Sequence, residues 1–173
     1  MVLQTKLASL RFGGHDFNSK YGMLKISAGV LLYRFISDQP EVLLFHPGGP
    51  YWEKKDIGVW SIAKGLVEEN ETLIESATRE LEEESGIKVT GKLVALKPVK
   101  QKSNKIVHAW ALEQDFDPSD IKSNMFEIEW PPATGNKLQF PEMDRAGWFG
   151  FDIAREKILN GQLPFLEELE TKI

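Results

Sequence analysis

The chain has 173 residues, of which 42% are apolar and 27% charged, and its formal net charge is −5. This length suits one domain with a sizeable core and is too short for two ordinary domains, while the net acidity argues against a general nucleic-acid binder, which would carry a basic face. The absence of cysteine excludes disulfides and thiolate metal sites, and because no apolar run could span a membrane and the N-terminus lacks a signal-peptide core, we expect a cytoplasmic protein with no membrane partner.

The N-terminal residues 1–22 show no sustained hydrophobic period, so we expect a poorly ordered extension followed by one domain over residues 23–173. The stretches 25–36 and 41–45 are rich in β-branched and aliphatic residues, which is typical of strands. Turn-forming residues separate the two stretches. We therefore expect an antiparallel hairpin at the start of the domain.

A loop is expected over residues 46–52, HPGGPYW, because two prolines and two glycines disrupt regular structure. Lys54 and Lys55 follow this loop. Together with His46 and Trp52, these lysines are candidates for binding a base and a phosphate chain. The alternative is a surface loop whose Trp52 packs on the domain.

A helix with clear ends is expected next. Residues 59–62 predict a short strand leading into Gly65, a residue that lets the backbone approach the following helix closely. Thr72 and Glu75 have the spacing of a capping box, and Gly86 tolerates the left-handed conformation that ends a helix. The expected helix has about thirteen residues and a length of roughly 20 Å.

Apolar and acidic residues are expected on adjacent sectors of this helix. The apolar stripe that should face the core consists of Leu73, Ile74, Ala77 and Leu81. Glu80, Glu83 and Glu84 border this stripe, and like charges at such spacings repel one another. A hard cation such as Mg²⁺ would remove the conflict, since it takes carboxylate oxygens and completes its shell with water and substrate phosphates. The alternative is a solvated acidic face, as in most Glu-rich runs.

The rest of the chain predicts further strands and two helices. The strands are expected over residues 88–99, 105–113, 125–130 and 146–151. Asp152 is expected to cap a helix that runs to residues 160–161, and Pro164 to begin a short final helix. The apolar side of this final helix consists of Phe165, Leu166 and Leu169.

Three lysines lie in or beside the loop that joins the first two of these strands: Lys100, Lys102 and Lys105. They are candidates for contacting phosphate. The alternative is that they are ordinary exposed lysines at a hairpin tip.

The stretch from Gly65 to Ile87 resembles the Nudix box, G-x5-E-x7-R-E-U-x-E-E-x-G-U, in which U is an aliphatic residue. The matching fixed positions are Gly65, Glu71, Arg79, Glu80, Glu83, Glu84 and Gly86, with Leu81 and Ile87 at the aliphatic places. With a frequency of about 7% for each Gly or Glu, chance agreement is below roughly one in a million. The stretches HPGGPYW, WSIAKG and FPEMDRAGWF resemble a bacterial branch of predicted pyrophosphohydrolases related to diadenosine polyphosphate hydrolases. Those groups usually carry proline where this chain has Ala63.

The resemblance implies an α/β fold of the Nudix type, an α/β/α sandwich with a mixed sheet. It also implies Mg²⁺-dependent hydrolysis of a phosphoanhydride bond in a nucleoside diphosphate linked to another group, with Mn²⁺ as the alternative cation. The metal ligands would be Glu80, Glu83 and Glu84, together with the carbonyl of Lys64 or Gly65. One of these glutamates, or Glu142, would deprotonate the water, and Arg79 would orient a carboxylate together with Glu71.

Two kinds of protein fit these patterns. The first is an enzyme acting on a small nucleotide-type diphosphate, with diadenosine polyphosphates as the first expectation, followed by nucleoside triphosphates and nucleotide sugars. Diphosphoinositol polyphosphates would need a dense basic pocket, which the net acidity disfavours. The second is a catalytically silent Nudix-like nucleotide-binding module, although such domains normally lose acids from the box. No pattern indicates an oligomeric state.

Overall fold

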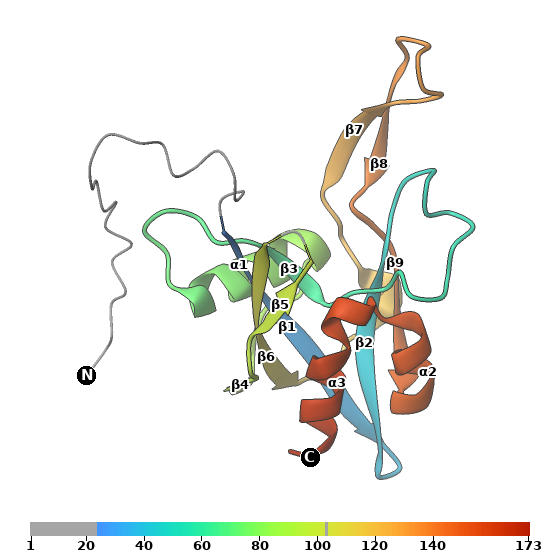
Figure 1. The fold of residues 1–173 in the computed structure, drawn as a ribbon. Coiled ribbons are helices and arrows are strands. Elements are labelled where there is room, and N and C mark those ends of the chain that lie inside the picture. Colours follow the sequence, from blue (N-terminus) through green and yellow to red (C-terminus); the bar gives the residue numbers. More distant parts are fainter. Residues whose placement is uncertain (1–23, 103) are drawn as a thin grey trace, which may run out of the picture.

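The computed structural model describes residues 24–102 and 104–173 (Figure 1), so the prediction for residues 1–22 lies outside the described residues. Strand β1, Lys25–Ile36, is the centre of the main sheet and forms over the predicted residues. Its middle residues, Ala28 to Leu32, are fully buried or nearly so because the sheet is covered on both faces. Burial on both faces explains why this strand is a continuous run of small and aliphatic residues.

Three strands pair directly with β1. Strand β2, Gln39–Pro47, runs antiparallel to its C-terminal half, and β3, Ala63–Leu66, runs antiparallel to its N-terminal half. Strand β6, Lys105–Glu113, runs parallel to β1 along the opposite edge. This parallel pair within an otherwise antiparallel arrangement confirms the predicted mixed sheet.

The remaining strands of the sheet lie at its two sides, in the order β4-β6-β1-β2-β9. Strand β9, Met143–Gly150, pairs with β2, whereas β4, Leu93–Ala95, and β5, Val99–Gln101, pair with β6. The prediction of one strand over residues 88–99 is therefore wrong. Between β4 and β5, Pro98 has no N–H to donate, and the N–H of Lys97 donates to a Glu168 side chain instead of to the sheet.

Helices cover both faces of this sheet and complete the predicted α/β/α sandwich. Helix α1, Leu73–Ser85, packs on one face, where Ala77 and Leu81 join alternate β1 residues in one core cluster. Helices α2, Phe151–Lys157, and α3, Leu163–Glu170, contribute to a second cluster that contains Leu31 from β1. The period of two residues along a strand assigns successive β1 side chains to these opposite layers.

A separate two-stranded sheet projects from the sandwich (Figure 1). It consists of β7, Met125–Glu129, and β8, Lys137–Pro141, which pair antiparallel. Strand β7 lies within the predicted residues 125–130, whereas β8 was not predicted from its sequence.

Several predicted boundaries are wrong. The strand expected over residues 59–62 lies four residues later, as β3, because the main chain joins β1 only from Ala63 onward. Strand β9 begins three residues earlier than expected, and Asp152 lies inside α2, where it pairs with Arg155 instead of capping the helix. The 3₁₀ turns Pro118–Asp120 and Asn160–Gln162 complete the described elements.

The final helix confirms its predicted apolar side, since Phe165, Leu166 and Leu169 are all buried. The prediction that Ile74 belongs to the core-facing stripe of α1 is wrong, because this residue is 42% exposed. Ser76 and Ser85 of the same helix are buried instead. Among residues 24–102 and 104–173, no helix combines the length and apolar character needed to cross a membrane.

Candidate active site

The ends of α1 are fixed by the residues that the sequence indicated. The Thr72 hydroxyl accepts the N–H of Glu75 at 3.3 Å, and the Glu75 carboxylate accepts the N–H of Thr72 at 2.7 Å, which confirms the capping box. Gly86 has a φ of 78° and donates its N–H to the Glu82 carbonyl, which closes the helix. These local contacts fix where α1 begins and ends.

The free edge of β3 faces the acids of α1. The N–H of Lys64 donates to the Glu84 carboxylate at 2.7 Å, so it points away from β1 and toward the helix. In a strand, the N–H and the carbonyl of one residue point to the same edge. The carbonyl of Lys64 is thus directed toward the acids, whereas Gly65 pairs with Ala28 of β1 in a position that turns its polar groups into the sheet.

Gly65 allows the side chain of Glu80 to lie directly against the backbone of β3. A Cβ atom at this position would be 2.0 Å from the Glu80 carboxyl carbon, and no real contact is that short. The predicted close approach between the glycine and the helix is confirmed. It places the Glu80 carboxylate over the backbone of β3 at Gly65, next to the residue whose carbonyl faces outward.

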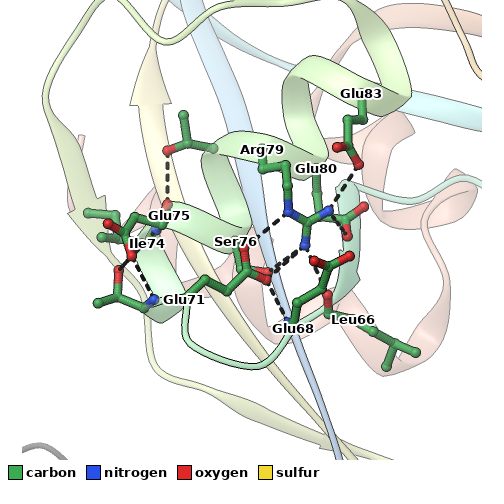
Figure 2. Close-up of polar contacts among 11 residues, drawn as sticks. Leu66, Glu68, Glu71, Ile74, Glu75, Ser76, Arg79, Glu80 and Glu83 are labelled. Carbon is green, nitrogen blue, oxygen red and sulfur yellow. Dashed lines mark hydrogen bonds and ion pairs between the residues drawn. The ribbon is translucent and has the colours of Figure 1, made fainter.

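Arg79 joins the acids of this region into one network (Figure 2). Its Nε and Nη2 atoms donate to the two oxygens of Glu71, at 3.1 and 2.8 Å, in the bidentate manner expected from the sequence. Its Nη1 atom donates to Glu80 at 2.8 Å and to Glu83 at 2.9 Å, and Nη2 also reaches the Leu66 carbonyl. The Arg79 hydrogen bonds hold the pKa of Glu71 down at about 2.

The two inner glutamates are partly buried, at an electrostatic cost. Burial raises the pKa of Glu84 to about 8, and the charges of Glu80 and Glu142 act in the same direction. Burial likewise raises the pKa of Glu80, although its hydrogen bond from Arg79 opposes the shift. Because both carboxyl groups resist ionisation, a nearby cation would favour their charged form at neutral pH.

The donor set fits a hard divalent cation. Glu80, Glu84 and the Lys64 carbonyl all present oxygen, the ligand atom that Mg²⁺ prefers. Among residues 24–102 and 104–173, no three acidic or histidine side chains lie close enough together to hold a metal ion as they stand. Glu80 and Glu83 are instead directed to the Arg79 guanidinium, so cation binding would draw them away from this partner.

Glu142 approaches the site from the base of the projecting hairpin. It lies between β8 and β9, donates its N–H to the Asn124 carbonyl and accepts the N–H of Gly48. A hollow of about 540 Å³ lies between the C-terminal end of α1 and residues 122–124. The sequence indicated Glu142 but not residues 122–124, which carry no pattern that would mark them.

The four residues predicted to bind substrate lie in different surroundings. His46 belongs to β2 and is fully buried, with Nδ1 2.7 Å from Asp144 and Nε2 2.7 Å from the Lys55 carbonyl. The loop predicted to begin at His46 therefore begins later, and this ring can influence a ligand only through the residues it holds. Trp52 is 37% exposed with the Lys55 ammonium 4.6 Å from its ring centroid, and Lys54 is also exposed.

One family model matches most of the chain, and solved structures share its fold. The family model described as the NUDIX domain matches residues 23–169. A C. elegans Ap4A hydrolase structure is 21% identical with a TM-score of 0.57, covering 86% of this chain and 98% of that one. The NUDIX domain of Shewanella oneidensis NrtR, solved with ADP ribose, is 14% identical with a TM-score of 0.60, covering 91% and 94%.

A curated relative named octanoyltransferase, from Myxococcus xanthus, is 32% identical over 101 residues. The match covers 58% of this chain and spans only about a quarter of that relative's length. The structural neighbours share the fold, and the family model spans most of the chain. The chain therefore belongs to the Nudix family.

Proposed function

We propose that this chain uses Mg²⁺ to hydrolyse a phosphoanhydride bond in a nucleoside diphosphate linked to another group. The observation that carries the proposal is the partly buried pair Glu80 and Glu84 against β3, beside the outward-facing carbonyl of Lys64. A fold gains nothing from two partly buried carboxyl groups of like charge, whereas a cation-bound diphosphate requires them.

Each residue of the site has a role that follows from its position. Glu80, Glu84 and the Lys64 carbonyl would hold the cation, with Glu83 as a further ligand from the same turn of the helix. When bound, the cation neutralises charge on the phosphate oxygens and lowers the pKa of a coordinated water. Arg79 positions the carboxylates and is itself fixed by its bidentate pair with Glu71.

The proton of the attacking water goes to one of the box glutamates or to Glu142. Support for Glu142 is that its charge acts on Glu84 while Glu142 itself is exposed to solvent. A Glu142→Gln variant distinguishes the two possibilities, because loss of the base lowers kcat while metal affinity is kept.

Diadenosine polyphosphates and nucleoside triphosphates are the substrates we favour. Support comes from the likeness to the Ap4A hydrolase structure and from the exposed ring of Trp52, which can stack on a base with Lys55 beside it. The buried His46 would act by holding the backbone of Lys55 in place.

A panel of nucleotide substrates tests the proposal, with product identification and with Mg²⁺, Mn²⁺ or chelator. We expect cation-dependent release of a nucleoside monophosphate or diphosphate, lowered about a hundredfold or more by Glu84→Gln. Glu82→Gln, on an exposed position of the same helix, is the matched control and should keep activity. Nucleotide binding without any product would support a binding module instead, and full activity of Glu84→Gln would refute the metal assignment.

A further inference from the structure

His46 is a fully buried histidine whose two ring nitrogens both face oxygen atoms. Nδ1 lies 2.7 Å from a carboxylate oxygen of Asp144 on β9, and Nε2 lies 2.7 Å from the backbone carbonyl of Lys55. A carbonyl and an ionised carboxylate accept hydrogen bonds and donate none. Both ring nitrogens must therefore carry hydrogen, and only the imidazolium cation has hydrogen on both.

The second proton of this pair belongs to the ring and not to Asp144. A carboxyl group is a far stronger acid than an imidazolium, so a proton shared between them rests on the ring. The Nε atom of Arg145 lies 3.3 Å from the same Asp144 oxygen, and its charge favours the ionised carboxylate. His46 and Asp144 thus form an ion pair that joins β9 to the loop between β2 and β3.

Arg145 does not replace either of these hydrogen bonds. Its Nη2 atom is 3.0 Å from both ring nitrogens of His46. The in-plane position equally distant from both nitrogens is blocked by the carbon between them, so Nη2 lies over the ring face and away from the lone pairs. The remaining charged groups nearby, Asp56 and Lys157, adjoin the neighbouring ring of Trp60 and pair with each other.

Loss of the second proton breaks one of the two contacts of the ring. The hydrogen that is left stays on Nδ1, because the ionised carboxylate of Asp144 is the stronger acceptor. The lone pair of Nε2 then faces the Lys55 carbonyl at 2.7 Å, and two acceptors at that distance repel each other. A neutral His46 ring therefore releases the Lys55 carbonyl.

This carbonyl holds the part of the loop that carries Trp52. The N–H of Lys55 donates to the Trp52 carbonyl at 2.7 Å, and the Lys55 ammonium lies 4.6 Å from the centroid of the Trp52 ring. The backbone of Lys55 thus links the position of Trp52 to β2 through His46. A displacement at Lys55 moves the surface to which base stacking is assigned above.

We propose that Asp144 and the imidazolium of His46 are positioning residues that hold Trp52 and Lys55 in place for substrate, and that this surface is released when the ring loses its second proton. The effect on substrate rests on the proposed function. The charge state of His46 stands on the geometry of the pair alone. Substrate affinity then depends on pH through residues that touch neither the substrate nor the cation.

Nitrogen NMR of the histidine rings tests the charge state without any substrate. The chain has three histidines, and the signals of His46 and His108 are identified by their absence from His46→Gln and His108→Gln. At pH 7 we expect hydrogen on both nitrogens of His46, whereas His108, whose pKa is lowered by burial, should carry hydrogen on one. Asp144→Asn, which removes the charge and keeps the shape, should make the His46 ring neutral. A neutral ring in wild type at pH 7, or an imidazolium that survives Asp144→Asn, overturns the proposal.

Hydrogen exchange tests the release of the loop, again without substrate. The amide of Lys55 should be protected in wild type at pH 7, because it donates to the Trp52 carbonyl. Its protection should fall about tenfold or more in Asp144→Asn, while His108→Gln, on a strand outside this network, should match wild type. Equal protection in wild type and Asp144→Asn would show that the pair does not hold the loop.

Steady-state kinetics at saturating Mg²⁺, with adenosine triphosphate or diadenosine tetraphosphate, test the effect on substrate. At pH 7 Asp144→Asn should raise KM about tenfold and keep kcat within about twofold, and the difference should vanish at the higher pH where the wild-type ring is neutral. Asp144→Glu, which keeps the carboxylate, should restore part of the lower KM. A KM unchanged by Asp144→Asn overturns the positioning role. If neither nucleotide is hydrolysed, the proposed function fails, and the ring NMR with the Lys55 exchange still decides this inference.

Discussion

Removing the carboxyl group of Glu84 should stabilise the metal-free protein at neutral pH. Burial behind the β3 edge raises the pKa of Glu84 to about 8, from an ordinary value of 4.5. In the folded protein this group therefore keeps a proton that the unfolded chain releases. Because the folded state binds more protons between these two pKa values, the free energy of unfolding falls as pH rises from about 4.5 to about 8.

The size of the effect follows from the shift in pKa. Each pH unit within this window lowers the free energy of unfolding by about 1.4 kcal/mol, so the change between pH 5 and pH 7 is about 3 kcal/mol. Glu84→Gln has no such slope, because its amide does not titrate and its oxygen still accepts the N–H of Lys64. The variant is thus expected to be the more stable protein at pH 7 and to lose this advantage towards pH 5.

Urea denaturation followed by tryptophan fluorescence measures this difference. Wild type, Glu84→Gln and the control Glu82→Gln are unfolded in chelator at pH 5, 6, 7 and 8. Glu82 is 51% exposed in its side chain, so its replacement should leave the slope of wild type unchanged. Parallel pH profiles for wild type and Glu84→Gln would refute the assignment of Glu84 as a buried acid with a raised pKa.

Other changes probe the support of the site. Gly65→Ala should reduce Mg²⁺ affinity in calorimetry by about tenfold or more, because the new Cβ displaces the Glu80 carboxylate; unchanged affinity would contradict the close approach. Leu81→Ala should lower the free energy of unfolding in urea by about 2–5 kcal/mol, since this side chain is fully buried. Glu71→Gln should melt at a lower temperature than wild type at pH 7, with the difference shrinking as pH falls from about 4.5 towards 2, because Arg79 depresses the pKa of Glu71; a constant difference would contradict it.

Helix α1 was predictable because its signals are short-range. Thr72, Glu75 and Gly86 cap the helix through contacts with residues at most four positions away, and the box acids follow from helical spacing once these ends are set. The bidentate pair between Arg79 and Glu71 was predictable for a similar reason, since both belong to one loop-helix unit.

Features that depend on distant partners were not predictable. The sequence around His46, with Pro47 and two glycines, is typical of a loop. In the structure His46 belongs to β2, and its buried ring pairs with Asp144, which lies far along the chain in β9. Strand β8 has only exposed and half-buried residues, and it becomes a strand because β7 pairs with it. The face shared by Lys25 and Lys105 is equally invisible in the sequence, because it arises from the parallel register of two strands.

The three partners of β1 have a consequence for how the molecule opens. Residues 25–33 pair with β6 along one edge, while residues 27–30 pair with β3 and residues 33–36 with β2 along the other, so most of both edges is covered. A fluctuation that exposes its amides to solvent must detach the strands on both sides and separate both layers of helices. The amides of Val30, Leu31 and Leu32 should accordingly exchange with deuterium only through global unfolding, and their protection provides a direct measure of the stability of the whole domain.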